Sequence, residues 1–342
     1  MRHLGLAVLF SLIGSLVWAF ELEESRSYDA PGDASRLRIL STADAAVFEP
    51  IIRAFQARHP GISITYDVAS STEVMKALSE EGAVYDLAIS SAMDLQTKLA
   101  NDGFAQSYAS DPTARLPAWA SWRNQVFAFT QEPAVLVYSR AAFAGLTLPA
   151  NREELIDLLR RNPDVFQGRV GTYDARASGL GYLFATQDSR NTESFWRLVE
   201  VMGRLDAKLY CCSGAMITDV AEGRLALAYN VLGSYASSRL AETPGVGIIE
   251  MEDFVRIMLR TALIPKTAHD PETAGLMIDF LAELPLRPDL VAQTGLPAVD
   301  ALGPSDSAAI RPIRLGPGLL VFLDSMRRST FLRSWVNSIE QQ

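Results

Sequence analysis

The chain has 342 residues and a formal net charge of −9, with 49% hydrophobic and 21% charged residues. This composition is ordinary for a globular protein, and the length is comfortable for two domains. An acidic chain lacks the broad basic surface that attracts nucleic acids and anionic membranes, so the charge argues against both as partners.

Residues 1–19 have the pattern of a cleavable signal peptide. A basic residue precedes an almost unbroken apolar run from Leu4 to Trp18, and Val17 and Ala19 put small side chains at the −3 and −1 positions of a cleavage site. The alternative is an uncleaved membrane anchor, for which the run is short, because a span needs about 20 apolar residues. We therefore expect export to the periplasm, with Phe20 as the first mature residue.

Polar residues dominate 20–35, which includes Pro31 and Gly32, and they predict a flexible lead-in. Apolar residues then follow strand and helix periods in turn. We expect strands at 37–41, 62–68 and 85–90, and helices at 45–59, 71–80 and 92–103. This alternation predicts a parallel, doubly wound α/β unit.

The pattern changes after Ala105. Two short strand-like runs, 125–130 and 134–138, lie in a segment with several prolines, which we interpret as a crossing between lobes. A second set follows, with strands at 168–174, 225–231, 246–251 and 256–265 and helices at 151–163, 178–187, 192–205, 212–222, 233–242, 270–284 and within 318–340.

The predicted fold class is therefore α/β, with two doubly wound lobes joined by a hinge. Such lobes close around a ligand at the carboxyl ends of their strands. We assign 36–132 and 262–342 to the first lobe, 139–250 to the second, and 133–138 and 251–261 to the hinge crossings.

Several segments carry a family resemblance, chiefly "LRILSTAD", "YDLAIS", "GTYDARASGLGY", "VAEGRLALAYNVLGSYA" and "RTALIPKTAHDPETAGLMIDFLAEL". They resemble periplasmic solute-binding proteins of ABC-type importers, in the branch with ferric-iron and organophosphate binders. "GLLVFLDSMRRSTFLRSW" is similar to phosphoglycerate-type regulatory members. The resemblance implies a monomeric type II periplasmic-binding-protein fold that captures a small anionic solute for a membrane ABC permease. It also leaves open a role as the ligand-sensing partner of a membrane sensor kinase.

Hydroxyl side chains follow two strands of the first lobe. Ser41 and Thr42 end one strand, and Ser90 and Ser91 end another. Hydroxyls and free amides at helix N-termini are donors for anions, so we predict ligand contacts here. The alternative is that these side chains only cap their helices.

In the second lobe, candidate ligand residues follow two further strands. Arg176 precedes a helix that opens at Ser178 and Gly179, and a guanidinium there would clamp a phosphate or carboxylate; alternatively it pairs with Asp174. The second group is Asn230, Ser234 and Tyr235. Arg260, in the return segment, either reaches the cleft or bridges the lobes.

The chain's only cysteines, Cys211 and Cys212, are adjacent. In an oxidising compartment they would form a strained vicinal disulfide, and otherwise they act as small hydrophobic residues. Because they lie between a strand and a helix, we predict that Cys212 and Ser213 border the cleft.

The sequence offers little for metal binding or catalysis. The resemblance implies that ferric binders use adjacent tyrosines, and this chain has no such pair. The mature chain contains only His59 and His269, neither with a partner at metal-ligand spacing. No hydrolase elbow, metalloprotease motif, phosphate loop or dinucleotide motif occurs. We therefore predict no metal, no cofactor and no enzymatic activity, and keep a ferric-ion binder and an exported hydrolase as alternatives.

Overall fold

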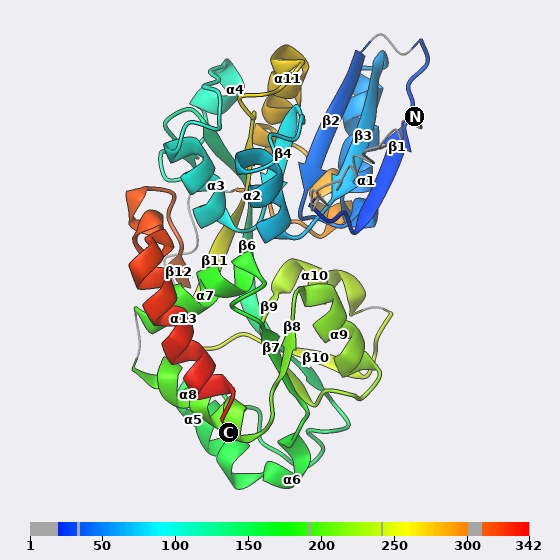
Figure 1. Ribbon diagram of the computed structural model, residues 1–342. Helices are drawn as coiled ribbons and strands as arrows, with labels where there is room; N and C mark the ends of the chain where they lie inside the picture. The colour runs from blue at the N-terminus through cyan, green and yellow to red at the C-terminus, as the bar shows by residue number, and fades with distance from the viewer. Residues whose placement is uncertain (1–19, 33–34, 191–192, 241, 300–309, 342) are drawn as a thin grey trace, which may run out of the picture.

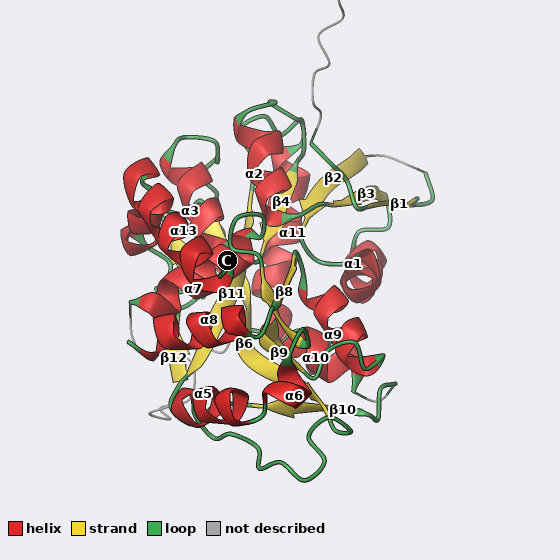
Figure 2. Cartoon of the chain, turned by 60° about the horizontal axis from the view of Figure 1, so that its bottom comes forward, coloured by secondary structure: helices red, strands yellow, loops and turns green. Residues whose placement is uncertain are grey.

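The computed structural model describes residues 20–32, 35–190, 193–240, 242–299 and 310–341. They form two lobes, upper and lower in Figure 1, with helices on both sides of the strands (Figure 2). The predicted signal peptide, 1–19, lies outside the described residues. Among those described, no helix combines the length and the apolar character needed to cross a membrane.

The first lobe contains a mixed sheet. Its strands run in the order β1, β3, β2, β4, β11 and β6, and β2 is parallel to both β3 and β4. The strand bounds are β1 Glu24–Tyr28, β2 Ser35–Ser41, β3 Ile62–Val68, β4 Leu87–Ser90, β5 Ser121–Trp122, β6 Val126–Ser139, β11 Val255–Leu263 and β12 Ile310–Pro312.

Helices cover this sheet, and α1 does so with an apolar stripe. In α1 the buried residues include Phe48, Ile51, Ile52 and Phe55, at the spacing of one helix face. The first-lobe helices are α1 Ala45–Arg58, α2 Ser71–Ser79, α3 Met93–Asn101, α4 Asp111–Ala114, α11 Pro271–Ala282 and α12 Pro288–Thr294, with a 3₁₀ turn, η1, at Leu284–Leu286.

The prediction of a flexible lead-in at 20–35 is wrong for part of that segment. Strand β1 pairs antiparallel with β3, from Glu24 opposite Val68 to Tyr28 opposite Ile64. Its polar composition reflects its position at the sheet edge, where only Tyr28 is buried. An edge strand with one solvated face reads as a polar loop when its neighbours are unknown.

The second lobe repeats the layered design. Strand β7 is parallel to β8 and β9, while β9 and β10 pair antiparallel with the end of β6. The strands are β7 Val170–Tyr173, β8 Lys208–Tyr210, β9 Leu227–Leu232 and β10 Val246–Ile249, and the helices are α5 Arg152–Arg161, α6 Pro163–Phe166, α7 Gly179–Ser189, α8 Ser194–Arg204, α9 Ser213–Ala221 and α10 Gly233–Arg239.

Two strands, β6 and β11, pass from one lobe to the other (Figure 1). The two predicted short runs at 125–130 and 134–138 are one continuous strand, β6. Arg260 of β11 is fully buried and pairs with Glu132 of β6, at 2.9 Å from Nε and 3.1 Å from Nη2. Ser234, at the start of α10, donates a hydrogen bond to the same carboxylate. Arg260 therefore belongs to a buried network that joins the crossing strands to the second lobe.

The C-terminal segment departs from the predicted lobe assignment. We placed 262–342 in the first lobe, but helix α13, Ser325–Ile339, lies beside α8 of the second lobe, after a 3₁₀ segment, η2, at Pro317–Leu323 (Figure 1). Phe331, Trp335 and Ile339 are buried in the second-lobe core. The two helices approach closely at Gly203, where an added Cβ would lie 2.4 Å from the Ser338 carbonyl oxygen.

Candidate functional site

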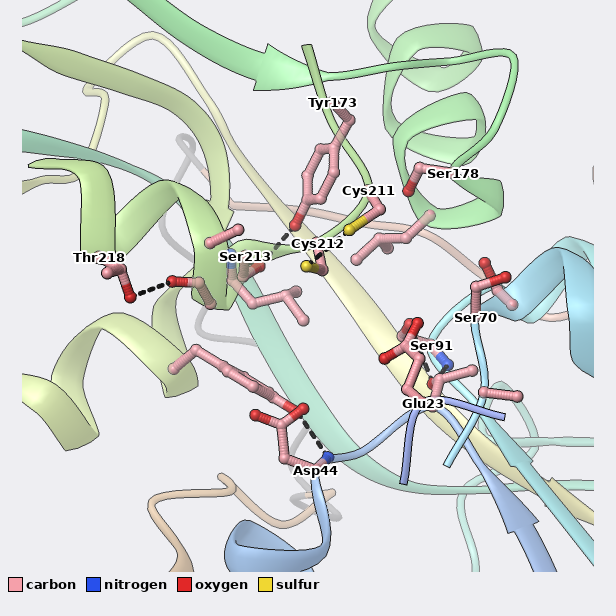
Figure 3. A pocket seen from close by; sticks show the side chains of 18 of the residues that line it. Glu23, Asp44, Ser70, Ser91, Tyr173, Ser178, Cys211, Cys212, Ser213 and Thr218 are labelled. Atoms are coloured by element: carbon pink, nitrogen blue, oxygen red, sulfur yellow. Dashed lines mark hydrogen bonds between the residues drawn. The ribbon is translucent and has the colours of Figure 1, made fainter. Parts of the chain in front are cut away.

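A cavity of about 280 Å³ lies between the lobes (Figure 3). Both lobes contribute polar side chains to it, mostly from strand ends and helix starts. The first lobe lines it with Glu23, Thr42, Asp44, Ala69, Ser70, Ser71 and Ser91, and the second with Tyr173, Ser178, Leu180, Cys211, Cys212, Ser213, Gly214, Ala215, Thr218, Leu232, Tyr235 and Arg239.

Four helices begin at this cavity. Their N-cap residues, Asp44 of α1, Ser70 of α2, Ser178 of α7 and Cys212 of α9, all line the wall. The serines accept hydrogen bonds from the amides of their own helices, whereas Asp44 and Cys212 make no side-chain cap bond. Converging helix N-termini give the cavity a positive local field and free amide donors, which suit an anionic group.

The cavity's cation is Arg239, the last residue of α10. Its Nη1 donates to the Gly214 carbonyl and to Thr218 Oγ1, both at 3.2 Å. In the part of the chain that the structure describes, no carboxylate pairs with this guanidinium. Its position is thus fixed by neutral groups, and its charge is left for a ligand.

Two carboxylates, Glu23 and Asp44, lie on the first-lobe side. Partial burial, together with the neighbouring Asp44 carboxylate, raises the pKa of Glu23. The cavity is therefore polarised, with hydrogen-bond acceptors on one side and Arg239 and the start of α9 on the other.

The lobes touch around the cavity. The Asp44 amide donates to the Tyr235 hydroxyl at 3.1 Å (Figure 3), and Thr72 Oγ1 donates to the Ala177 carbonyl at 3.1 Å. Gly179, the first residue of α7, faces the start of α2 so closely that an added Cβ would lie 2.6 Å from Ser71 Oγ. These contacts define a closed arrangement of the two lobes.

Comparisons with known proteins identify the family. Residues 37–285 match the model for bacterial extracellular solute-binding proteins. The chain belongs to this family. A crystal structure of the substrate-binding protein of an ABC transporter from Agrobacterium tumefaciens is 34% identical, with a TM-score of 0.87 over 92% of this chain and 98% of that one. The comparison with curated protein sequences gave no match.

More distant solved structures share the fold of this solute-binding protein. Iron-bound HitA from Pseudomonas aeruginosa is 18% identical, with a TM-score of 0.67 over 89% of this chain and 99% of that one. AfuA from Actinobacillus pleuropneumoniae, with fructose-6-phosphate bound, is 13% identical, with a TM-score of 0.70 over 90% and 99%. The predicted two-lobed type II fold is confirmed.

Part of the predicted ligand set of this solute-binding protein lines the cavity. Thr42 and Ser91 face each other, with 3.3 Å between their hydroxyl oxygens, and the Ser91 amide donates to Thr42 Oγ1 at 3.0 Å. Ser213 Oγ lies 2.5 Å from the Tyr173 hydroxyl. The predicted residues that line the cavity are Thr42, Ser91, Ser178, Cys212, Ser213 and Tyr235.

Two other predicted serines, Ser41 and Ser90, do not line the cavity and form hydrogen bonds within the first lobe. Ser41 accepts hydrogen bonds from the Tyr66 hydroxyl at 2.7 Å and from the Ala43 amide at 3.0 Å. Ser90 accepts from the Ala92 amide at 3.1 Å. Neither serine caps a helix, because the N-caps of α1 and α3 are Asp44 and Ala92. Both oxygens instead accept hydrogen bonds within the first lobe.

Arg176, Gly179, Asn230 and Ser234 are also absent from the cavity wall. Arg176 pairs with Asp174 at 2.8 Å and with Glu340 at 2.6 Å, which matches the ion-pair alternative. Asn230 adopts a positive φ of 61° and donates to Asp188 at 3.0 Å.

Sequence reasoning missed Arg239 and Glu23. Arg239 follows Tyr235 by one helical turn on α10, so the i, i+4 rule would have placed both on the same face. Glu23 was missed because the lead-in was expected to be flexible.

The described residues contain no preformed cluster of metal ligands. Across the described residues, no group of three or more His, Cys, Asp or Glu side chains could hold an ion. His59 and His269 lie outside the cavity wall. The oxygen donors at hand are Glu23, Asp44 and the two tyrosines.

Proposed function

We propose that this solute-binding protein captures a small anionic solute, an organophosphate or a carboxylate, by closing its lobes, and that it delivers the solute to a membrane ABC permease. Its family implies a location outside the cytoplasm, which accords with the predicted signal peptide. The observation that carries the ligand class is Arg239, a cavity guanidinium without a carboxylate partner among the described residues, beside the N-terminus of α9.

The polarity of the cavity favours one orientation. The anionic group of the solute would lie against Arg239 and the amides of α9, where charge-assisted hydrogen bonds are strongest. Hydroxyl or ammonium groups of the solute would donate to Glu23 and Asp44. A volume of about 280 Å³ suits a metabolite of a few carbons.

Ferric ion is a second candidate, since Tyr173, Tyr235, Glu23 and Asp44 are oxygen donors on one cavity. Each tyrosine hydroxyl is already engaged, one with Ser213 and the other with Asp44. Burial raises the pKa of both phenols, so forming the tyrosinates that ferric ion prefers costs free energy. These features rank ferric ion below an anionic metabolite.

Two further roles remain predictions. A sensor kinase as partner rests on the resemblance of the C-terminal segment alone. A hydrolase would need a base near a nucleophile, and neither histidine of the mature chain lines the cavity.

A thermal-shift screen tests the proposal. The purified mature protein should be stabilised by phosphorylated or carboxylated metabolites, because a ligand that binds only the native state raises the midpoint of unfolding. Stabilisation by ferric salts alone, with a tyrosinate charge-transfer band, would support the iron candidate and overturn the anion proposal. Turnover of an ester or phosphoester without stable binding would support the hydrolase.

A further inference from the structure

The adjacent cysteines form part of the cavity wall. Cys211 and Cys212 occupy the turn between β8 and α9, and both line the cavity. Their sulfur atoms are free thiols 2.8 Å apart and lie toward one another in Figure 3. The chain has two cysteines in all, so neither thiol has another intramolecular partner.

We propose that Cys211 and Cys212 are an oxidation site, at which a low-molecular-weight disulfide converts the dithiol into a vicinal disulfide and thereby remodels the cavity wall. Neither the chemical step nor the remodelling depends on which solute the protein binds. The proposal therefore stands or falls separately from the proposed function.

The two thiols differ in exposure, and this difference decides which of them reacts first with an oxidant. Cys211 is exposed, whereas Cys212 is partly buried. Burial, followed by the hydrogen bond between the two thiols, raises the pKa of Cys212 to about 12. Cys211 is therefore the sulfur that first meets an oxidant from solution, and Cys212 is the resolving thiol.

The exchange balances with a disulfide RSSR as the oxidant. The Cys211 thiolate attacks one sulfur of RSSR, releases one RS⁻ and leaves a mixed disulfide. Cys212 then loses its proton, and its sulfur attacks Sγ of Cys211 and expels the second RS⁻. Both leaving thiolates take up the protons that the cysteines lose, so the protein dithiol gives two electrons to RSSR and yields two RSH.

The consequence follows from the place of Cys212 in the fold. Cys212 is the N-cap of α9, and the next residues, Ser213 and Gly214, form its first turn. The Gly214 carbonyl accepts the hydrogen bond that holds Arg239. Closing a ring between adjacent residues twists the intervening peptide, so oxidation acts directly on the turn that positions the cavity's cation.

The test begins with mass spectrometry of the full mature protein after incubation in buffers of oxidised and reduced glutathione. Free thiols are blocked with iodoacetamide, and the protein is digested with trypsin without reductant. The peptide Leu209–Arg224 contains both cysteines. We expect it to lose two hydrogens and carry no blocking group. Only glutathione adducts, only disulfide-linked dimers, or a fully blocked peptide at the most oxidising ratio would each overturn the proposal.

Amide hydrogen exchange then tests the remodelling. Oxidised wild type should differ from reduced wild type at least twofold in the exchange rates of peptides that cover 209–224. The double variant Cys211→Ser, Cys212→Ser, taken through the same buffers, is the matched control and should not change. Equal exchange in oxidised and reduced wild type would show that the disulfide leaves the wall as it was, which contradicts the proposal.

Discussion

Asp94 is a buried carboxyl group on α3, 2% exposed, whose Oδ1 accepts a hydrogen bond from the Leu95 amide. Burial raises the pKa of Asp94 to about 7, although the Arg328 guanidinium acts in the opposite direction. In the unfolded chain this pKa is about 3.9. The folded state therefore holds the proton more tightly, so the free energy of unfolding falls as pH rises from about 4 to about 7 and then levels off.

We predict that Asp94→Asn removes this decrease in the free energy of unfolding with pH. At pH 3 the variant and wild type should be similar in stability, because the Asp94 carboxyl is then neutral in both the folded and the unfolded state. At pH 8 the variant should be more stable by roughly 3–4 kcal/mol, because about three pKa units separate the two states. Urea unfolding at the two pH values measures this, with the exposed Asp157→Asn as control. The same pH slope in Asp94→Asn and wild type would contradict the prediction.

Individual site residues could be predicted only where the backbone fixes them. Thr42, Ser91 and Ser213 follow strand ends, and the α/β pattern alone brings such ends to the cleft. Which arginine faces the cavity depends on side-chain partners instead. Arg176 follows a strand end, as a cleft residue would, but it forms ion pairs with Asp174 and Glu340. Glu340 is distant in sequence, so this pair could not be predicted.

Most of the longer helices and strands were predicted, whereas short elements such as β8 and α12, and the placement of the terminal segments, were not. Periodicity identified the helices within 318–340. The sequence of an amphipathic helix, however, does not specify which lobe its apolar face packs against. Edge strand β1 was missed for a related reason, because its polar face resembles a loop. Both errors concern segments near the ends of the chain, whose partners lie far off in sequence.

The packing of α13 on α8 predicts a selective effect of a single methyl group. Ala at position 203 favours a helix by about 1 kcal/mol over Gly. Here its Cβ would meet the Ser338 and Ile339 carbonyl oxygens at 2.4 and 2.8 Å. Gly203→Ala should therefore lower stability by roughly 1–3 kcal/mol.

Thermal unfolding checks this, with Gly245→Ala as the matched control, since nothing lies within 4 Å of a Cβ there. If both variants unfold at the wild-type temperature, α13 does not pack on α8 as described.

At the scale of the whole molecule, function requires that the lobes part and close. Gly179 permits the closed form, because α7 and α2 meet there without a side chain between them. A methyl group at this position would lie 2.6 Å from Ser71 Oγ and 2.8 Å from Leu95 Cδ1, both across the cleft. Because Ser71 and Leu95 belong to the other lobe, parting the lobes would relieve this contact.

We predict that Gly179→Ala weakens solute binding about two- to fivefold, because the ends of the Ser71 and Leu95 side chains must move aside in the closed form. Small-angle X-ray scattering should show that saturating solute compacts wild type and Gly245→Ala more than Gly179→Ala. Equal affinity and equal compaction in all three proteins would mean that the lobes do not close through this contact.

The most direct test of the account is calorimetric titration of the solute found in the thermal-shift screen against wild type, Arg239→Gln and Arg176→Gln. Arg239 lines the cavity with its charge unpaired among the described residues, whereas Arg176 is held by two carboxylates. We predict that Arg239→Gln raises Kd at least tenfold, about 1.4 kcal/mol or more, and that Arg176→Gln changes it less than twofold. Unchanged affinity in Arg239→Gln, or a tenfold loss in Arg176→Gln, would contradict the assignment of this cavity as the anion site.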